Sequence, residues 1–180
     1  MFAYKGFQRG LKCRGYQFSM GKNVTEAANC GQNGFHCAEN PLDCLSYYGN
    51  INFSDYCLVI PGGDMDEDQV DSKISCTELT IVKKLTIQEF FLHGLAYMVD
   101  HANRNWSSHV QKDRGTASSG YCVVRGTDPL ACGAKGSILA FAKDDPGSGK
   151  IIQIALTYVD GRKIRANTWY DIDWKERKGA

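Results

Sequence analysis

One histidine of this sequence lies where acid–base chemistry on a phosphodiester could take place. His36 is followed by Glu39 and by a helix predicted to begin at Pro41 with Asn40 as its N-cap. An imidazole exchanges protons near neutral pH, a carboxylate can assist it, and a helix N-terminus attracts phosphate. We therefore predict His36 as the catalytic acid or base, with Glu39 in support. The alternative is a structural histidine, which the sequence favours because no second acid or base follows at motif spacing, and Glu39 equally suits helix capping.

Basic and aromatic residues alternate near the N-terminus, a composition typical of RNA contact. Lys5, Arg9, Lys12 and Arg14 could bind phosphates while the aromatic residues between them stack on bases. Alternation along strands would divide these groups between two faces, so a half-buried strand is the alternative interpretation.

The cysteine residue types suggest a metal site, but their spacing argues against one. Cys30, Cys37 and Cys44 recur every seven residues beside His36, but the Cys-x2-4-Cys knuckle of structural zinc sites is missing from the sequence. We predict no metal and treat the thiols as small buried hydrophobic groups. His93 and His101 are expected on a polar helix face, and they make no catalytic pair with each other or with His109.

Composition and motifs narrow the classes of function. The net charge of +1 gives no global field toward nucleic acid or membrane, so any such binding must be local. No apolar run reaches the roughly 18 to 20 residues of a membrane helix, and no export signal is recognisable. We therefore predict a protein of the cytoplasm with reduced cysteines and no disulfides. The sequence has no Walker loop, dinucleotide fingerprint or nucleophile elbow, so we expect no cofactor.

The helices and strands predicted to position these residues indicate an α+β fold. Antiparallel strands are expected in 3–30, 56–60 and 73–85, with two main helices, one at Pro41 and one over 86–103 that begins with a Thr86–Glu89 capping box. The small residues of 104–136 predict a loop-rich segment or the remnant of a solenoid. Strands in 138–141, 151–159 and 162–172, with a turn at Asp160-Gly161, would form a C-terminal β-meander. We divide the chain into an N-terminal α+β domain, 1–103, and a β-rich part, 104–180.

Several sequence motifs resemble a family of uncharacterised phage and prophage proteins. They are Tyr-Lys-Gly-Phe at 4–7, Leu-Lys-Cys-Arg-Gly-Tyr-Gln-Phe at 11–18, Gly-Phe-His-Cys-Ala-Glu-Asn-Pro-Leu-Asp at 34–43, and the segments 71–74, 115–120 and 159–170. Longer members of that family carry many small-residue repeats in the middle, whereas this chain has few.

The resemblance implies an anti-defence function in a bacterial host. A short phage protein without standard enzyme motifs is similar to type II-A anti-CRISPR proteins that act on Cas9 and cause shortening of its guide RNA. The expected partners are then Cas9 and guide RNA, and a ribonuclease-like activity would depend on that complex. Under this hypothesis Lys5, Arg9, Lys12 and Arg14 contact RNA phosphates. The alternative is a non-enzymatic structural or interaction protein of phage particles.

Overall fold

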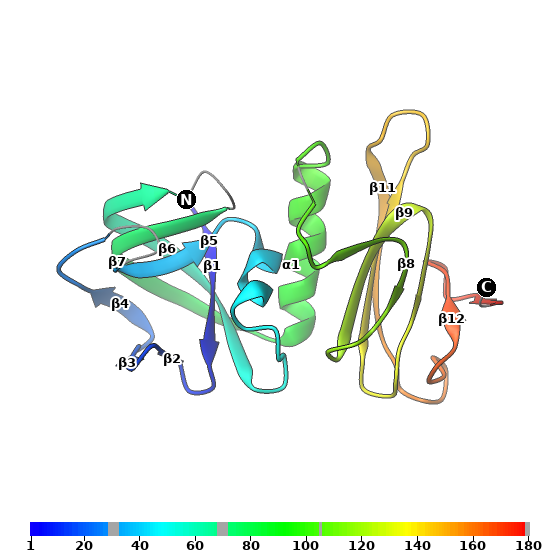
Figure 1. Ribbon diagram of the computed structural model, residues 1–180, viewed down its shortest axis with the longest axis horizontal. Helices are drawn as coiled ribbons and strands as arrows, with labels where there is room; N and C mark the ends of the chain where they lie inside the picture. Colours follow the sequence, from blue (N-terminus) through cyan, green and yellow to red (C-terminus); the bar gives the residue numbers. More distant parts are fainter. Residues whose placement is uncertain (29–32, 68–71, 105, 179–180) are drawn as a thin grey trace. The chain divides into compact units, whose positions relative to one another are not determined.

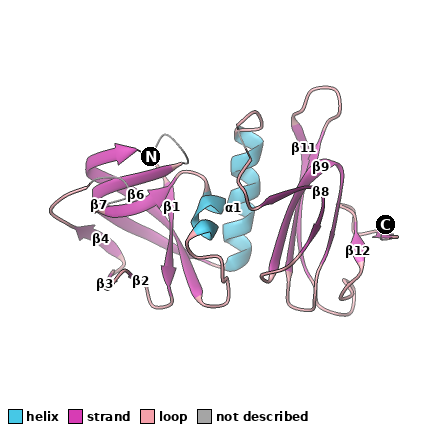
Figure 2. Cartoon of the chain, in the orientation of Figure 1, coloured by secondary structure: helices cyan, strands magenta, loops and turns pink. Residues whose placement is uncertain are grey.

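The computed structural model describes residues 1–28, 33–67, 72–104 and 106–178. It is mainly β, with 49% of residues in strands and 12% in helices, and the strands form two sheets (Figures 1 and 2). The prediction of an α+β fold with two main helices is therefore wrong. The chain forms two compact units, Met1–Phe90 (unit 1) and Phe91–Ala180 (unit 2).

The helix predicted at Pro41 is the 3-10 helix η1, Pro41–Ser46. The predicted cap does form, because the Asn40 side chain accepts the backbone N–H of Leu42 at 3.1 Å. The Tyr47 N–H bonds to the Cys44 carbonyl, three residues back, as in the tighter 3-10 geometry. Correct capping chemistry thus starts a turn of helix here, and the segment is too short to become a second main helix.

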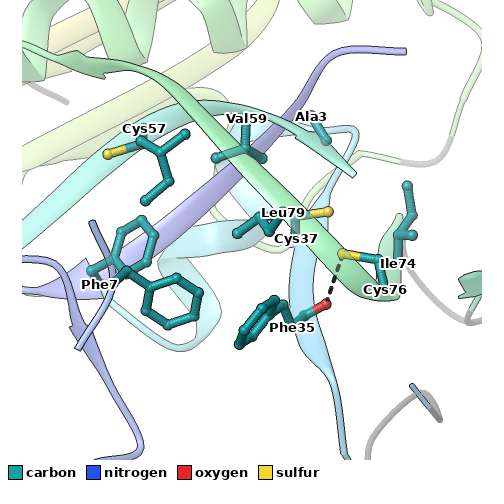
Figure 3. Packing of buried hydrophobic residues seen from close by; sticks show 11 residues of the cluster. Ala3, Phe7, Phe35, Cys37, Cys57, Val59, Ile74, Cys76 and Leu79 are labelled. Atoms are coloured by element: carbon teal, nitrogen blue, oxygen red, sulfur yellow. Dashed lines mark hydrogen bonds between the residues drawn. The ribbon is translucent and has the colours of Figure 1, made fainter. Parts of the chain in front are cut away.

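The described residues of unit 1 form seven strands, all paired antiparallel. They are β1 (Ala3–Gln8), β2 (Lys12–Cys13), β3 (Tyr16–Gln17), β4 (Gly21–Val24), β5 (Phe35–Ala38), β6 (Ser54–Glu67) and β7 (Lys73–Leu85). β1 pairs with β6 and β5, and β7 also pairs with β6 and β5, so these four strands close into a ring. The core of the unit comes from buried residues of these strands, including Phe7, Val59, Cys76 and Leu79 (Figure 3).

β6 continues past Ile60, the end of the predicted strand 56–60, and runs through Pro61-Gly62-Gly63 to Glu67. Its pairing with β7 shifts between Gly62 and Met65, and Gly63 has a φ of +69°. A Cβ at Gly63 would lie 2.1 Å from the Thr77 hydroxyl oxygen. A glycine bulge therefore accommodates the irregularity and lets pairing resume.

The helix α1, Ile87–Asp100, begins where the capping box predicted. The Thr86 N–H donates to the Glu89 carboxylate at 2.8 Å, and the Glu89 N–H donates to the Thr86 hydroxyl at 3.2 Å. Its apolar stripe is buried: in unit 1 Phe90 stacks on Tyr56 at a ring distance of 3.9 Å, and in unit 2 Phe91 packs on Tyr121. In the described part of the chain, no helix is both long enough and apolar enough to cross a membrane.

Unit 2 contains six strands in its described residues, the first two of them in the segment 104–136 that was predicted as loop-rich or a solenoid remnant. They are β8 (Val110–Thr116), β9 (Tyr121–Cys132), β10 (Ile138–Asp144), β11 (Ile151–Tyr158), β12 (Trp169–Tyr170) and β13 (Glu176–Arg177). β9 pairs in parallel with both β8 and β10. The connections 117–120 and 133–137 are too short for crossover helices. The three strands therefore stack as successive turns of a coil.

The predicted strand over 162–172 is reduced to Trp169–Tyr170. The Asp160 carboxylate accepts the backbone N–H groups of Arg162 and Ile164 at 2.7 and 3.1 Å. These bonds compete with strand pairing and turn the segment into an irregular loop.

A buried arginine ties together three segments of unit 2. Arg125 is 4% exposed, and its Nε donates to both Asp144 carboxylate oxygens at 2.9 and 3.2 Å. Its Nη2 donates to the carbonyls of Ala102 and Gly149, and the guanidinium lies 4.7 Å from the centre of the Trp106 ring. The strand pair β9–β10 and the flanking loops thus depend on one cation.

We expect Arg125→Met to destabilise unit 2 by about 3–5 kcal/mol, because it leaves the largely buried Asp144 carboxylate without its partner. Urea unfolding followed by tryptophan fluorescence tests this, since all three tryptophans lie in unit 2. Arg114→Met, at an exposed position of β8, is the control and should change the free energy of unfolding by less than about 0.5 kcal/mol. Equal effects of the two substitutions would contradict the prediction.

Candidate functional site

The candidate site of unit 1 lies where β1 and β5 separate. The two strands pair through Tyr4 and Ala38. If the same register continued, Gly6 would lie opposite His36. β1 instead pairs onward with β2 at Gln8, and a pocket of about 200 Å³ lies at the seam. Side chains from β1, the β2–β3 hairpin, β5, η1 and the start of β7 line the pocket.

The Lys5 side chain, and not the backbone of β1, contacts β5 beyond the Tyr4–Ala38 pair. Its Nζ donates to the His36 carbonyl at 2.6 Å and lies 5.3 Å from the ring centres of both Phe7 and Phe18. The residue is 5% exposed, and the described residues offer its ammonium no carboxylate partner. A buried cation held only by a carbonyl and two aromatic rings is an electrostatically favourable place for an anion.

Two further cations line the same pocket. Arg14 is exposed on the β2–β3 hairpin, where its φ of 47° places the backbone in the left-handed region. Within the described residues its guanidinium forms no ion pair. Lys73 begins β7, and its Nζ lies 3.5 Å from the Tyr47 hydroxyl and 5.9 Å from the centre of that ring.

The pKa of His36 reflects its burial and the nearby cations. Partial burial lowers the pKa of His36 below its ordinary 6.5, and the positive charges of Lys5, Arg14 and Lys73 lower it further. The imidazole is therefore neutral at pH 7. It can accept or donate one hydrogen bond without adding charge.

One wall of the pocket is aromatic and is packed tightly against β1. A Cβ at Gly6 would lie 2.6 Å from Cδ2 of Tyr48, so only glycine allows this ring to cover the strand. The Tyr48 hydroxyl donates to the Cys13 sulfur at 3.0 Å. Tyr47, by contrast, is 60% exposed, so part of its ring is accessible to a ligand.

Asp43 is the acidic residue of the pocket lining. Its carboxylate accepts the Ser72 hydroxyl at 2.7 Å and the Asn40 amide at 3.2 Å. Both donors are neutral, so Asp43 does not neutralise the cations through either bond.

The structure brings together some of the residues predicted for catalysis and RNA binding. His36, Lys5 and Arg14 line the pocket, whereas Glu39, Arg9 and Lys12 do not. Sequence reasoning missed Lys73 and the tyrosines at 47 and 48. The only available signal was the basic and aromatic character of these residues, and their proximity to His36 depends on the β5–β7 pairing.

The cysteines and remaining histidines of the described residues make no second site. No group of three or more His, Cys, Asp or Glu side chains there could hold a metal ion, and Cys30 lies outside the described residues. Seven cysteines are free thiols, and burial raises the pKa of Cys44 and of Cys57 to about 12. His101 stacks on Tyr97, and His109 Nδ1 lies 3.1 Å from the Tyr121 hydroxyl.

The geometry defines a mainly-β domain with a cationic, partly aromatic pocket at a seam between strands. Residues 1–93 match the family described as "Domain of unknown function (DUF7666)", and the chain belongs to this family. The match contains every residue of the pocket. Neither a curated protein nor a solved structure matches the chain.

We expect the His36 imidazole to titrate below pH 6.5 in NMR spectra and the midpoint to rise in Arg14→Asn, because one of the neighbouring cations is removed. Asparagine tolerates the left-handed backbone at position 14. Since the unfolded chain binds the proton more tightly, His36 should also lower the free energy of unfolding as the pH falls through 6.5. A titration midpoint that stays the same in Arg14→Asn would contradict an effect of the Arg14 charge on the pKa of His36.

Proposed function

We propose that unit 1 binds RNA through a phosphate group held in this pocket. The observation that supports the proposal is Lys5, a residue only 5% exposed whose ammonium has no carboxylate partner among the described residues. Keeping such a charge away from water is unfavourable unless something compensates it. A bound phosphate would supply that compensation through charge-assisted hydrogen bonds.

The surroundings of Lys5 favour a nucleotide over a simple anion. The exposed Tyr47 ring could stack on a base, a contact that tolerates any sequence. Arg9 and Lys12 are exposed near the same hairpin and would meet phosphates further along the strand. The neutral His36 imidazole would hydrogen bond to a phosphate or ribose oxygen.

For the whole chain we propose an inhibitor of a type II-A Cas9–guide RNA complex in the cytoplasm of the bacterial host. The support for these partners is the resemblance in the sequence, and the pocket offers a contact for the RNA of such a complex. The alternative is a non-enzymatic interaction protein of phage particles, which would bind no RNA.

Cleavage of the guide RNA by His36 with Glu39 stays a prediction. The pocket contains His36 without Glu39, and its cations would also stabilise the charge of a phosphate under attack. Shortening of guide RNA that survives His36→Ala would assign the cleavage to the partner nuclease.

We expect the protein to bind labelled guide RNA, alone or in the Cas9 complex, and to lose at least about tenfold in affinity in Lys5→Met or Arg14→Asn. Fluorescence anisotropy and a denaturing gel, with RNA alone, Cas9 alone and the complex, measure binding and cleavage. Lys22→Gln, at an exposed position of β4 outside the pocket, is the matched control and should lose less than about threefold. Binding to Cas9 alone with no effect of the pocket substitutions would contradict the RNA proposal.

A further inference from the structure

The two cations without carboxylate partners set the charge that a ligand of this pocket must carry. Lys5 and Arg14 both line the pocket, and neither has a carboxylate partner among the described residues. The carboxylate of the lining, Asp43, is occupied by Ser72 and Asn40. The complementary ligand group therefore carries about two negative charges.

Phosphate groups of RNA differ in this respect. An internal phosphodiester carries one negative charge, whereas a terminal phosphate monoester carries about −1.5 to −2 at pH 7, because its second pKa is near 6. The monoester also exposes three oxygens and so can contact Lys5, Arg14 and Lys73 together. The diester uses two of its four oxygens in bonds to the chain.

The volume of the pocket suits the terminal nucleotide of an RNA strand. About 200 Å³ is below the roughly 300 to 1,000 Å³ of pockets that enclose drug-sized ligands. It has room for a phosphate with part of one nucleoside, and the covering by Tyr48 on Gly6 closes it on the β1 side.

Resting on the proposed RNA binding, we infer that the pocket recognises the terminal phosphate monoester of an RNA strand in preference to an internal phosphodiester. Lys5 at the buried side and Arg14 at the exposed side would contact the terminal oxygens. The first base would stack on Tyr47.

The test compares three versions of one short oligoribonucleotide, with a 5′-phosphate, with a 3′-phosphate and with hydroxyl groups at both ends. Isothermal titration calorimetry with the full chain should show at least tenfold tighter binding of one phosphorylated version than of the hydroxyl-ended strand. The better of the two identifies the recognised end. A nucleoside monophosphate of the same polarity should compete, and the nucleoside should not.

Two pocket substitutions, each with its fold verified, test whether the cations produce the preference. Lys5→Met keeps the buried aliphatic stem and removes the ammonium, and Arg14→Asn changes an exposed residue. Each should reduce the preference for the phosphorylated end to less than threefold, while Lys22→Gln, at an exposed position of β4 outside the pocket lining, should leave it unchanged. Unaltered circular dichroism spectra would verify the fold of each variant.

The outcomes separate this inference from the proposed function. Equal affinity for all three strands, weakened equally by Lys5→Met, would overturn the terminal preference and leave RNA binding in place. Binding of the nucleoside monophosphate without binding of any RNA would support the monoester site and overturn the RNA proposal. Absence of binding to every phosphorylated probe would overturn both.

Discussion

The hydrogen bond from the Lys5 ammonium to the His36 carbonyl is the contact on which the pocket depends. Where β1 turns away from β5, the His36 carbonyl loses the backbone donor that a continued ladder would provide. A buried carbonyl needs a partner, and the long lysine side chain reaches it across the seam. The same bond fixes a positive charge beneath the pocket.

The rest of unit 1 supports that charge without cancelling it. Phe7 and Phe18 offer ring faces to the ammonium, and they belong to the core of the strand ring. Gly6 lets Tyr48 close the wall above. The packing that orders the core therefore also keeps Lys5 in place, and the cation is part of the fold before any ligand binds.

Local chemistry could be predicted from the sequence, and long-range pairing could not. The Thr86–Glu89 capping box and the Asn40 cap are formed by residues close in sequence, and both exist in the structure. The closure of β1, β6, β7 and β5 into a ring depends on contacts between distant residues, as does the placement of Lys73 beside His36. Lys5, Arg14 and His36 were each identifiable as polar residues with possible chemistry, but alternation on strands gave no reason to expect them in one pocket.

For the segment 104–136 the sequence left a loop-rich segment and a solenoid remnant as alternatives, because small residues have two structural uses. They occur in flexible loops, and they also occur where backbones approach closely. Gly115 shows the second use: a Cβ there would lie 2.3 Å from the Cys122 sulfur, so stacked β8 and β9 leave no room for a side chain. The small side chains of 104–136 thus reflect close packing of parallel strands.

The protonated state of Cys44, a thiol of the pocket lining, favours binding over covalent chemistry at this position. A nearby ammonium lowers a thiol pKa, and Lys5 does act on Cys44 in this direction. Burial nevertheless dominates and raises the pKa of Cys44 to about 12, so this thiol stays protonated and unreactive at neutral pH. His36 is kept neutral by burial and by the same cation. With neutral thiol and imidazole groups around a fixed positive charge, the pocket attracts an anion and offers it hydrogen bonds, while the lining lacks an activated thiolate nucleophile at Cys44.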